Sequence, residues 1–311
     1  MLSRRALIAG LALTSCVYAQ SDPPSYRSDV RVVTLLATVR DKSTGAIVND
    51  LSKDDFRLEE DGRRQNIRYF SKESDLPLVL ALLVDTSQSM RPVFGPERAA
   101  SNRFLQQILR EDRDLAAVVH FDVAVGILQD FTSSREKLAS ALDGLRIPPR
   151  GQVGTLLYES IRDASETLMK NRVGRKAVIL LSDGLDFRDD TSIGTAIEYA
   201  QRADTLIYSV LYSRFGPRGG RGINVAIGPR QNRGPRIMER LARETGGAYF
   251  RVSQAQPIDS IYTQIENELR NQYSIRYTPD ASTIDGKYRR VKVTTLREGL
   301  VVRTRDGYYP Q

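Results

Sequence analysis

The chain has 311 residues, of which 41% are hydrophobic and 27% are charged, and its formal net charge is +8. This composition supports one large hydrophobic core, or one large and one small core, and excludes a chain that is disordered by composition. Acidic and basic residues interleave along most of the sequence, tryptophan is absent, and neither a zinc-finger spacing nor a basic helix with interspersed aromatic residues occurs, so the positive charge indicates a solvated surface and no nucleic-acid binding.

The first 20 residues, MLSRRALIAGLALTSCVYAQ, have the form of an export signal. Their apolar run is too short for a permanent transmembrane helix. Cleavage after Ala19 would remove a signal peptide of residues 1–19 and leave a soluble protein, whereas LTSC at residues 13–16 resembles a lipoprotein box that would leave Cys16 lipidated. Since Cys16 is the only cysteine, the mature domains contain no disulfide. We expect an exported protein of the periplasm, cell envelope or exterior, at a membrane only if Cys16 is lipidated.

A polar linker with two prolines, residues 20–28, leads into a β segment that covers residues 29–73. Its first part, DVRVVTLLATVRD, is rich in β-branched residues and predicts a strand. Its second part, DFRLEEDGRRQNIRY at residues 55–69, predicts two short strands that are joined by an Asp61-Gly62 turn.

The sequence changes character over residues 77–272, where strand-like apolar runs alternate with helix-like segments. This alternation predicts an open, mostly parallel, doubly wound sheet with helices on both faces, which is an α/β fold. The expected strands are residues 78–84, 115–121, 177–181, 205–211 and 248–252. The expected helices are residues 96–110, 135–145, 156–169, 193–203, 236–244 and 257–271.

One segment inside this α/β part stands apart. Residues 213–236 hold six arginines, six glycines and three prolines, which is too long and too glycine-rich for an ordinary connection. The segment is either a plain surface loop or a basic contact loop for an acidic partner or an anionic polymer.

A second β segment, residues 273–311, ends the chain, with strands expected at residues 273–277, 288–295 and 300–304. Neither β segment is large enough to bury much surface alone. We therefore expect the N- and C-terminal segments to pair as one small β-sandwich beside the α/β part.

Oxygen-bearing side chains follow the first strand of the α/β part, PLVLALLVDTSQSM at residues 77–90. Asp85 ends the apolar run, and Ser87 and Ser89 follow in the turn. In open α/β sheets, ligands bind outside the carboxyl ends of the strands. A carboxylate and two hydroxyls suit a hard divalent cation such as Mg²⁺, which prefers about six oxygen ligands. Neighbouring strand ends must supply the rest.

Two later residues meet that requirement. Thr155 opens the helix expected at residues 156–169, and Asp183 stands just beyond the carboxyl end of the strand expected at residues 177–181. Taken alone, Thr155 would be a helix N-cap and Asp183 a turn residue of an Asp-Gly pair. Together with the DxSxS run, in this order and on these elements, they indicate a metal site.

Residues 77–272 resemble a von Willebrand factor type A domain in this pattern. The metal-ion-dependent adhesion site of that family, D-x-S-x-S with a distant Thr and Asp, implies a ligand set of Asp85, Ser87, Ser89, Thr155 and Asp183. In the family, the serines and in some states the Thr touch the cation, the acids often act through water, and a carboxylate of a protein partner completes the shell. The resemblance thus implies Mg²⁺, or Mn²⁺ or Ca²⁺, and such a partner. The flanking segments resemble an exported VWFA-related family described from Acidobacteria.

We therefore expect an exported, cation-dependent binding or adhesion module. The alternatives are an assembly scaffold of the cell envelope with a mainly stabilising metal, and a hydrolase. The hydrolase is disfavoured because Ser87 stands where a D-x-D phosphatase needs a second acid, and because no phosphate-binding P-loop and no G-x-S-x-G elbow occur. The only histidine, His120, lies in an apolar run as a packing residue, which leaves no general base of the usual kind. The partner, the natural cation and the oligomeric state stay open.

Overall fold

The structure is a computed structural model that describes residues 32–72, 76–152, 154–187, 190–212, 233–279 and 286–310. The described residues from Val32 onward form one compact unit. The expected signal peptide with Cys16, the linker at residues 20–28 and most of the Arg/Gly-rich segment lie outside the described residues. Within the described ranges, no helix has the length and apolar character needed to cross a membrane.

A six-stranded sheet in the order β10-β9-β8-β5-β6-β7 forms the centre of the α/β part, and all its strands except β7 run parallel. Every residue of β5 is buried, which is why that strand is continuously apolar in sequence. The expected fold class is confirmed. The six strands are β5 (Leu78–Asp85), β6 (Leu115–Phe121), β7 (Val125–Thr132), β8 (Arg175–Ser182), β9 (Thr205–Leu211) and β10 (Tyr249–Arg251).

The edge strand β7 was not expected from the sequence. It pairs antiparallel with β6, and none of its residues is fully buried. An edge strand packs against a neighbour on one side only, so it needs neither a continuous apolar run nor strict alternation. Its sequence VGILQDFT therefore gives a weak strand signal.

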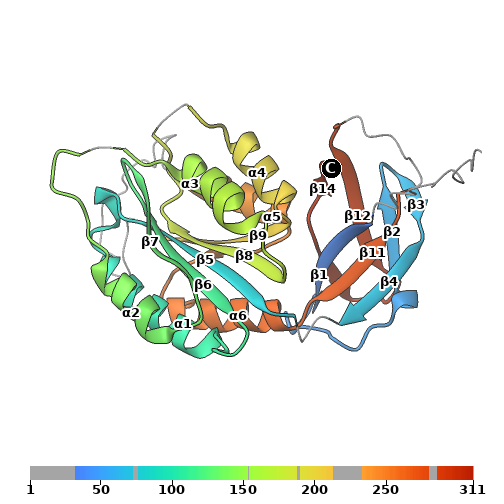
Figure 1. Cartoon of the computed structure of the whole chain (residues 1–311). Coiled ribbons are helices and arrows are strands. Elements are labelled where there is room, and N and C mark those ends of the chain that lie inside the picture. The colour runs from blue at the N-terminus through green and yellow to red at the C-terminus, as the bar shows by residue number, and fades with distance from the viewer. Residues whose placement is uncertain are drawn as a thin grey trace, which may run out of the picture. The chain divides into compact units, whose positions relative to one another are not determined.

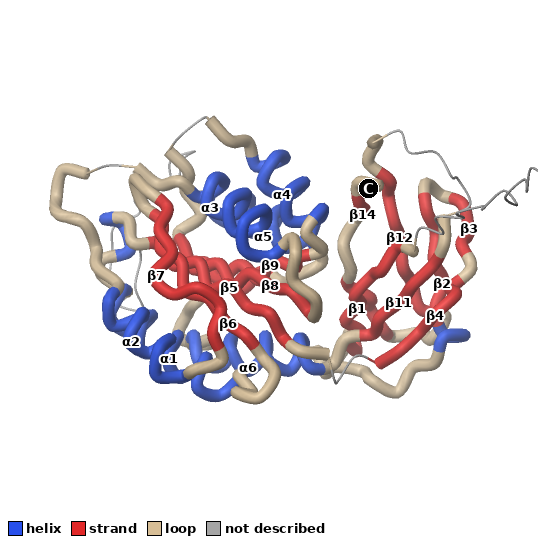
Figure 2. Tube along the Cα trace, viewed as in Figure 1, coloured by secondary structure: helices blue, strands red, loops and turns tan. Residues whose placement is uncertain are grey.

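Helices cover both faces of the sheet (Figures 1 and 2). Alternate residues of β5 point to opposite faces: Leu80 and Leu82 join the core under α1, α2 and α6, whereas Ala81 and Leu83 join the core under α3, α4 and α5. The helices are α1 (Phe94–Ile108), α2 (Arg135–Gly144), α3 (Leu157–Asp163), α4 (Ile193–Arg202), α5 (Arg233–Thr245) and α6 (Ile258–Arg270).

Two helices differ from their expected form. The helix expected at residues 156–169 is α-helical only as α3 and continues as a π-helix over Ala164–Met169. The helix expected at residues 236–244 begins earlier, as α5 at Arg233, so the last residues of the Arg/Gly-rich segment are helical rather than loop.

The two flanking segments fold together as a β-sandwich of two four-stranded sheets, β13-β1-β11-β4 and β14-β12-β2-β3. One hydrophobic core, with Leu35, Leu58, Ile275 and Val293 from both flanks, fills the space between the sheets. The strands are β1 (Val33–Asp41), β2 (Phe56–Glu60), β3 (Arg63–Gln65), β4 (Ile67–Lys72), β11 (Tyr273–Tyr277), β12 (Arg289–Thr295), β13 (Leu300–Arg303) and β14 (Gly307–Tyr308).

The turn expected at Asp61-Gly62 joins β2 to β3, and both residues have positive φ values, of 48° and 78°. The second strand expected in this stretch is in fact two strands. The strand is interrupted at Asn66, where the chain crosses from the sheet that contains β3 to the sheet that contains β4. Such a switch lets one short stretch serve both layers of a sandwich.

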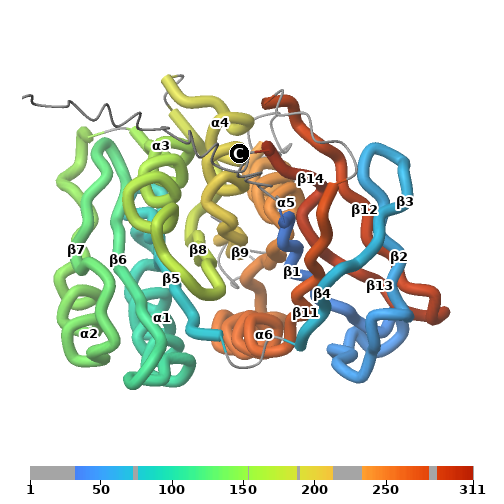
Figure 3. Tube along the Cα trace, turned by 45° about the vertical axis from the view of Figure 1, so that its right-hand side comes forward, coloured from blue at the N-terminus to red at the C-terminus, as the bar shows by residue number. Residues whose placement is uncertain are grey.

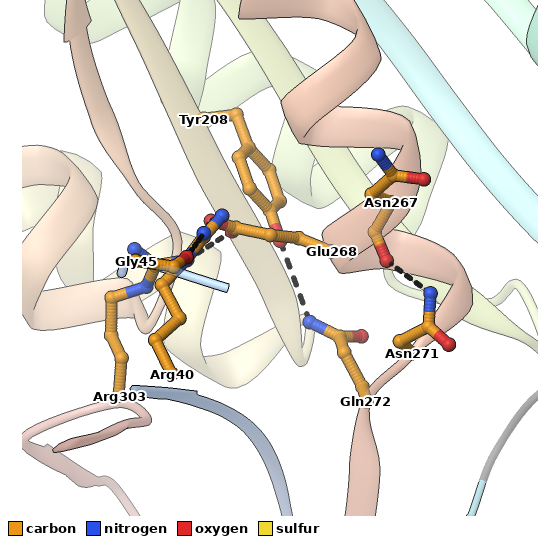
Figure 4. Close-up of polar contacts among 8 residues, drawn as sticks. All are labelled: Arg40, Gly45, Tyr208, Asn267, Glu268, Asn271, Gln272 and Arg303. Atoms are coloured by element: carbon orange, nitrogen blue, oxygen red, sulfur yellow. Dashed lines mark hydrogen bonds and ion pairs between the residues drawn. The ribbon is translucent and has the colours of Figure 1, made fainter. Parts of the chain in front are cut away.

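The C-terminal end of α6 meets the sandwich at a buried acid, Glu268 (Figure 4). Arg40 of β1 places Nη2 2.6 Å from Glu268 Oε1, and Arg303 of β13 pairs with Glu268 Oε2. Beside them, Gln272 Nε2 donates to the hydroxyl of Tyr208 in β9 at 3.5 Å. Figure 3 shows α6 running along the α/β part toward β11. Polar contacts thus tie the last helix of the α/β part to two sandwich strands.

Candidate metal centre

Asp85 lies at the carboxyl end of β5 and is fully buried. Its Oδ1 accepts a hydrogen bond from the Ser87 N–H at 2.8 Å, and its Oδ2 accepts one from Ser182 Oγ, at the end of the neighbouring β8, at 2.6 Å. Burial raises the pKa of Asp85 to about 7, and the charge of Asp183 acts in the same direction, whereas the hydrogen bonds oppose it. Among the described residues, no Lys or Arg pairs with this carboxylate. It is therefore a buried acid that lacks a counter-charge.

The two serines come together because the chain turns sharply after β5. Ser87 is the N-cap of a short 3₁₀ helix, Gln88–Met90, and this turn places Ser87 Oγ and Ser89 Oγ 3.0 Å apart. Ser87 is buried and Ser89 partly buried. The DxSxS run thus presents one carboxylate and two adjacent hydroxyls at one strand end.

Backbone hydrogen bonds hold Thr155 across the end of β5. The N–H of the next residue, Leu156, donates to Asp122 O after β6 at 2.9 Å, and Phe187 N after β8 donates to Thr155 O at 3.1 Å. Because β5 lies between β6 and β8, these two hydrogen bonds place Thr155 at the carboxyl end of β5. The alternative role as a helix N-cap is wrong, because the N-cap of α3 is Leu156. Thr155 itself is buried.

Asp183 is the first residue after β8 and is buried. Its Oδ1 accepts a hydrogen bond from Leu185 N at 3.2 Å, so it also serves the turn that its Asp-Gly sequence indicates. Its charge nevertheless acts on Asp85 across the same edge of the sheet. All five expected residues therefore lie at the carboxyl edge around β5, and their binding of a metal stays a prediction.

Sequence reasoning missed two residues that support this edge. Ser182 bonds directly to Asp85, as described above, and Asp122 Oδ2 accepts a 2.6 Å hydrogen bond from the Thr86 hydroxyl. The available signal was the one used for Asp183, because Asp122 directly follows one expected strand, residues 115–121, and Ser182 directly follows another, residues 177–181. Asp186, which the sequence leaves without a role, accepts a 3.2 Å hydrogen bond from Tyr158 N at the start of α3.

The only histidine also lies near this edge. His120 of β6 packs over Gly126 of β7, where an added Cβ would lie 2.4 Å from His120 Nε2. Its Nδ1 is 3.9 Å from Asp122 Oδ2, which is too long for a hydrogen bond. These contacts agree with a packing residue.

A further acid, Glu97 of α1, is buried near Asp85 of the candidate metal centre. Neither of its carboxyl oxygens has a hydrogen-bond partner among the described residues. Burial raises the pKa of Glu97 well above its usual value, and the charge of Asp85 adds to the shift. A glutamate within a polar helix is typical of a solvated face, so the sequence alone gave no sign of it.

Glu97→Gln should stabilise the protein more at alkaline than at acidic pH. Because the folded-state pKa of Glu97 lies above its unfolded value of 4.5, the stability from the protonated acid is complete below 4.5 and is lost as pH rises through the folded-state pKa. When melting temperatures are measured in EDTA from acid to alkaline pH, the melting temperature of Glu97→Gln should rise increasingly above that of the wild type. Glu239 on α5 is exposed, so for Glu239→Gln the difference in melting temperature from the wild type should not change with pH. If the difference for Glu97→Gln does not change with pH either, the prediction is contradicted.

A family model for the von Willebrand factor type A domain matches residues 80–186, a stretch that contains all five candidate ligands. The match does not extend to the flanks, so their resemblance to an exported Acidobacterial family stays a prediction. The chain matches no curated protein.

Several solved structures resemble the chain. Proximal thread matrix protein 1 from the mussel byssus, with a zinc-occupied MIDAS motif, is 14% identical, with a TM-score of 0.50 over 68% of this chain and 50% of that one. BatB from Bacteroides thetaiotaomicron is 19% identical, with a TM-score of 0.47 over 62% and 97%. The vWF domain of the pili tip protein Mfa5 from Porphyromonas gingivalis is 14% identical, with a TM-score of 0.46 over 62% and 94%. At these identities the likeness concerns the fold alone. Residues 80–186 of the chain thus match the von Willebrand factor type A domain family.

Proposed function

We propose that the chain is an exported binding module that captures an acidic group of a protein partner through a divalent cation. The cation would sit at the adhesion site, which consists of Asp85, Ser87, Ser89, Thr155 and Asp183. The observation that carries the proposal is the buried Asp85 carboxylate, which has no counter-charge among the described residues and faces hydroxyls and a second acid at one edge of the sheet.

The donor set fits a hard cation. It consists of two carboxylates and three hydroxyls, and oxygen ligands suit Mg²⁺, Mn²⁺ and Ca²⁺. In the described part of the chain, no group of three or more His, Cys, Asp or Glu side chains could hold a metal ion, so a metal here depends on the hydroxyls. Because one solved relative has zinc at its MIDAS motif, Zn²⁺ belongs among the cations to be tested.

A bound divalent cation would supply a positive charge that attracts a carboxylate. Ser87, Ser89 and Thr155 would hold the cation through neutral oxygens, so the protein would neutralise only part of its charge. Asp85 would balance another part, and the Ser87 N–H and the Ser182 hydroxyl keep the Asp85 carboxylate oriented toward the serines. The remaining positive charge would favour an Asp or Glu side chain of the partner.

Capture of a partner should therefore require both the cation and a free carboxylate. Immobilised protein should retain partners from a cell-envelope extract in Mg²⁺, release them in EDTA and retain them again after Mg²⁺ is restored. Ser87→Ala should lose capture, whereas Ser133→Ala, outside the adhesion site, should keep it. Converting the carboxylates of the extract to amides should also abolish capture. If EDTA leaves every interaction intact, the mechanism is wrong.

A scaffold with a mainly stabilising metal is the second candidate, and the burial of both Asp85 and Glu97 favours it. A cation placed between such acids would stabilise the fold whatever the partner does. Under this function, Ser87→Ala would lower the melting temperature in Mg²⁺ and leave capture intact. The binding function predicts lost capture, whatever the change in melting temperature.

A further inference from the structure

A cavity of about 720 Å³ lies between the α/β part and the sandwich. Helices α4 and α5 form one wall, and β2, β12 and the C-terminal stretch form the other. An ion pair joins the two walls, because Arg243 Nε of α5 lies 3.4 Å from Asp306 Oδ2. The volume falls within the range of about 300–1,000 Å³ that small-molecule sites have. None of the described residues that line this cavity belongs to the adhesion site.

Two tyrosines, Tyr288 and Tyr309, form an aromatic surface inside the cavity. Their ring centroids lie 5.2 Å apart, and the ring planes are inclined by 58°. Arg202 of α4 lies over the Tyr309 ring, with Cζ 4.8 Å from the centroid, and Tyr288 packs on Gly307, where an added Cβ would lie 2.4 Å from Tyr288 Cζ. Both tyrosines remain partly exposed, so a ligand can contact rings that the protein already holds in place.

The charged groups that line the cavity balance one another. They are three acids and three bases, Glu59, Glu244, Asp306, Arg240, Arg290 and Lys292. All six are at least partly exposed, so a ligand can replace the water that now solvates them. Because the charges cancel, the lining favours neither an anion nor a cation. A purely apolar ligand is excluded as well, since it would remove water from charged groups without replacing its hydrogen bonds.

We propose that this cavity binds an uncharged sugar, as a short oligosaccharide whose ring lies against Tyr288 and Tyr309 and whose hydroxyls bond to the charged side chains around them. The faces of a sugar ring carry C–H groups, which the negative face of an aromatic ring attracts. Its hydroxyls both donate and accept hydrogen bonds, so they can use carboxylates and cationic donors alike. An uncharged sugar thus matches the aromatic surface and the balanced charges together. The site is independent of the adhesion site and of the function proposed for it.

Binding is tested by calorimetry of the mature protein with three uncharged sugars, maltotriose, cellotriose and N-acetylated chitotriose. EDTA is included so that no sugar can bind through a metal at the adhesion site. At least one of the sugars should bind saturably, with an affinity that changes little between low and high sodium chloride because the ligand has no charge. Tyr309→Ala should bind it about 10-fold more weakly or worse, since the aromatic contact is lost. Tyr69→Ala removes a tyrosine of β4 that is 64% exposed and does not line the cavity, and it should bind like the wild type.

Two further variants separate sugar contacts from effects on folding. Tyr309→Phe keeps the ring and its packing against Arg202, so it should bind far better than Tyr309→Ala. Lys292→Met changes an exposed side chain, so it should melt like the wild type and weaken binding by a smaller factor than Tyr309→Ala. The proposal is overturned if none of the three sugars binds, or if Tyr309→Ala and Lys292→Met both bind like the wild type. It is also overturned if the zwitterionic dipeptide lysyl-aspartate binds more tightly than every sugar, which would assign the cavity to a peptide.

Discussion

Glu268→Ala is expected to lower the free energy of unfolding by about 3 kcal/mol, because it leaves Arg40 and Arg303 without their shared acid. This value is at the lower end for a broken buried ion pair, since the two arginine side chains are 23% and 31% exposed and keep part of their hydration. The contacts also join α6 to two sandwich strands, so the loss affects both parts of the unit. Urea denaturation measures the effect.

The control lies on the same helix. Asp259→Ala removes an ion pair with Arg103 whose side chains are 55% and 60% exposed, and it should cost about 1 kcal/mol or less. Glu268→Gln should fall between the two variants, because the amide oxygen can still accept a hydrogen bond from one arginine. If Glu268→Ala costs no more than Asp259→Ala, the junction contributes little to stability.

Asp85→Asn should weaken Mg²⁺ binding by more than about 100-fold, because substitutions of residues that only support a metal ligand already cost 10- to 100-fold. The same change should leave the metal-free protein at least as stable as the wild type at neutral and alkaline pH, since it removes a buried charge that has no counter-charge among the described residues. Melting temperatures with Mg²⁺ and with EDTA measure both effects. The wild type should gain from Mg²⁺ and the variant should not.

Asp112→Asn is the matched control, because Asp112 is exposed and lies away from the adhesion site. It should keep the full response to Mg²⁺. If Asp85→Asn melts far below the wild type in EDTA, the predicted stability of the metal-free variant is wrong. Such a result would mean that the hydrogen bond from Ser182 to Asp85, which links the ends of β8 and β5, matters more than the charge.

The sequence predicted the fold best where a residue pattern has a single physical explanation. A continuous apolar run occurs where a strand is buried on both faces, so β5 was predicted almost to the residue. Parallel strands place their carboxyl ends at one edge of the sheet, which is why the sequence alone predicts that Asp85 and Asp183 are neighbours. The same reasoning would have included Asp122, but an acid after a strand is too common in turns to select alone.

Other features depend on packing between distant segments, which a single sequence does not show. Glu97 and Lys176 look like ordinary surface residues, and only the packed structure buries them. Arg40 and Glu268 are separated by 228 positions, and no local pattern links them. Short edge strands such as β14 escaped prediction for a related reason, since each is fixed by its neighbour more than by its own residues.

The placement of the α/β part between the two halves of the sandwich has a consequence for folding. The strands β1, β2 and β4 pair with strands that are synthesised much later. The hydrogen bond from Arg290 N to Asp61 Oδ1, for example, closes a span of 229 residues. Contacts this distant form slowly and late. During synthesis, the α/β part can form its own local contacts while β1 and β2 still expose unpaired edges. A ribosome that stalls after α6 would leave those edges available to another chain, so the last strands of this protein also protect the first ones from aggregation.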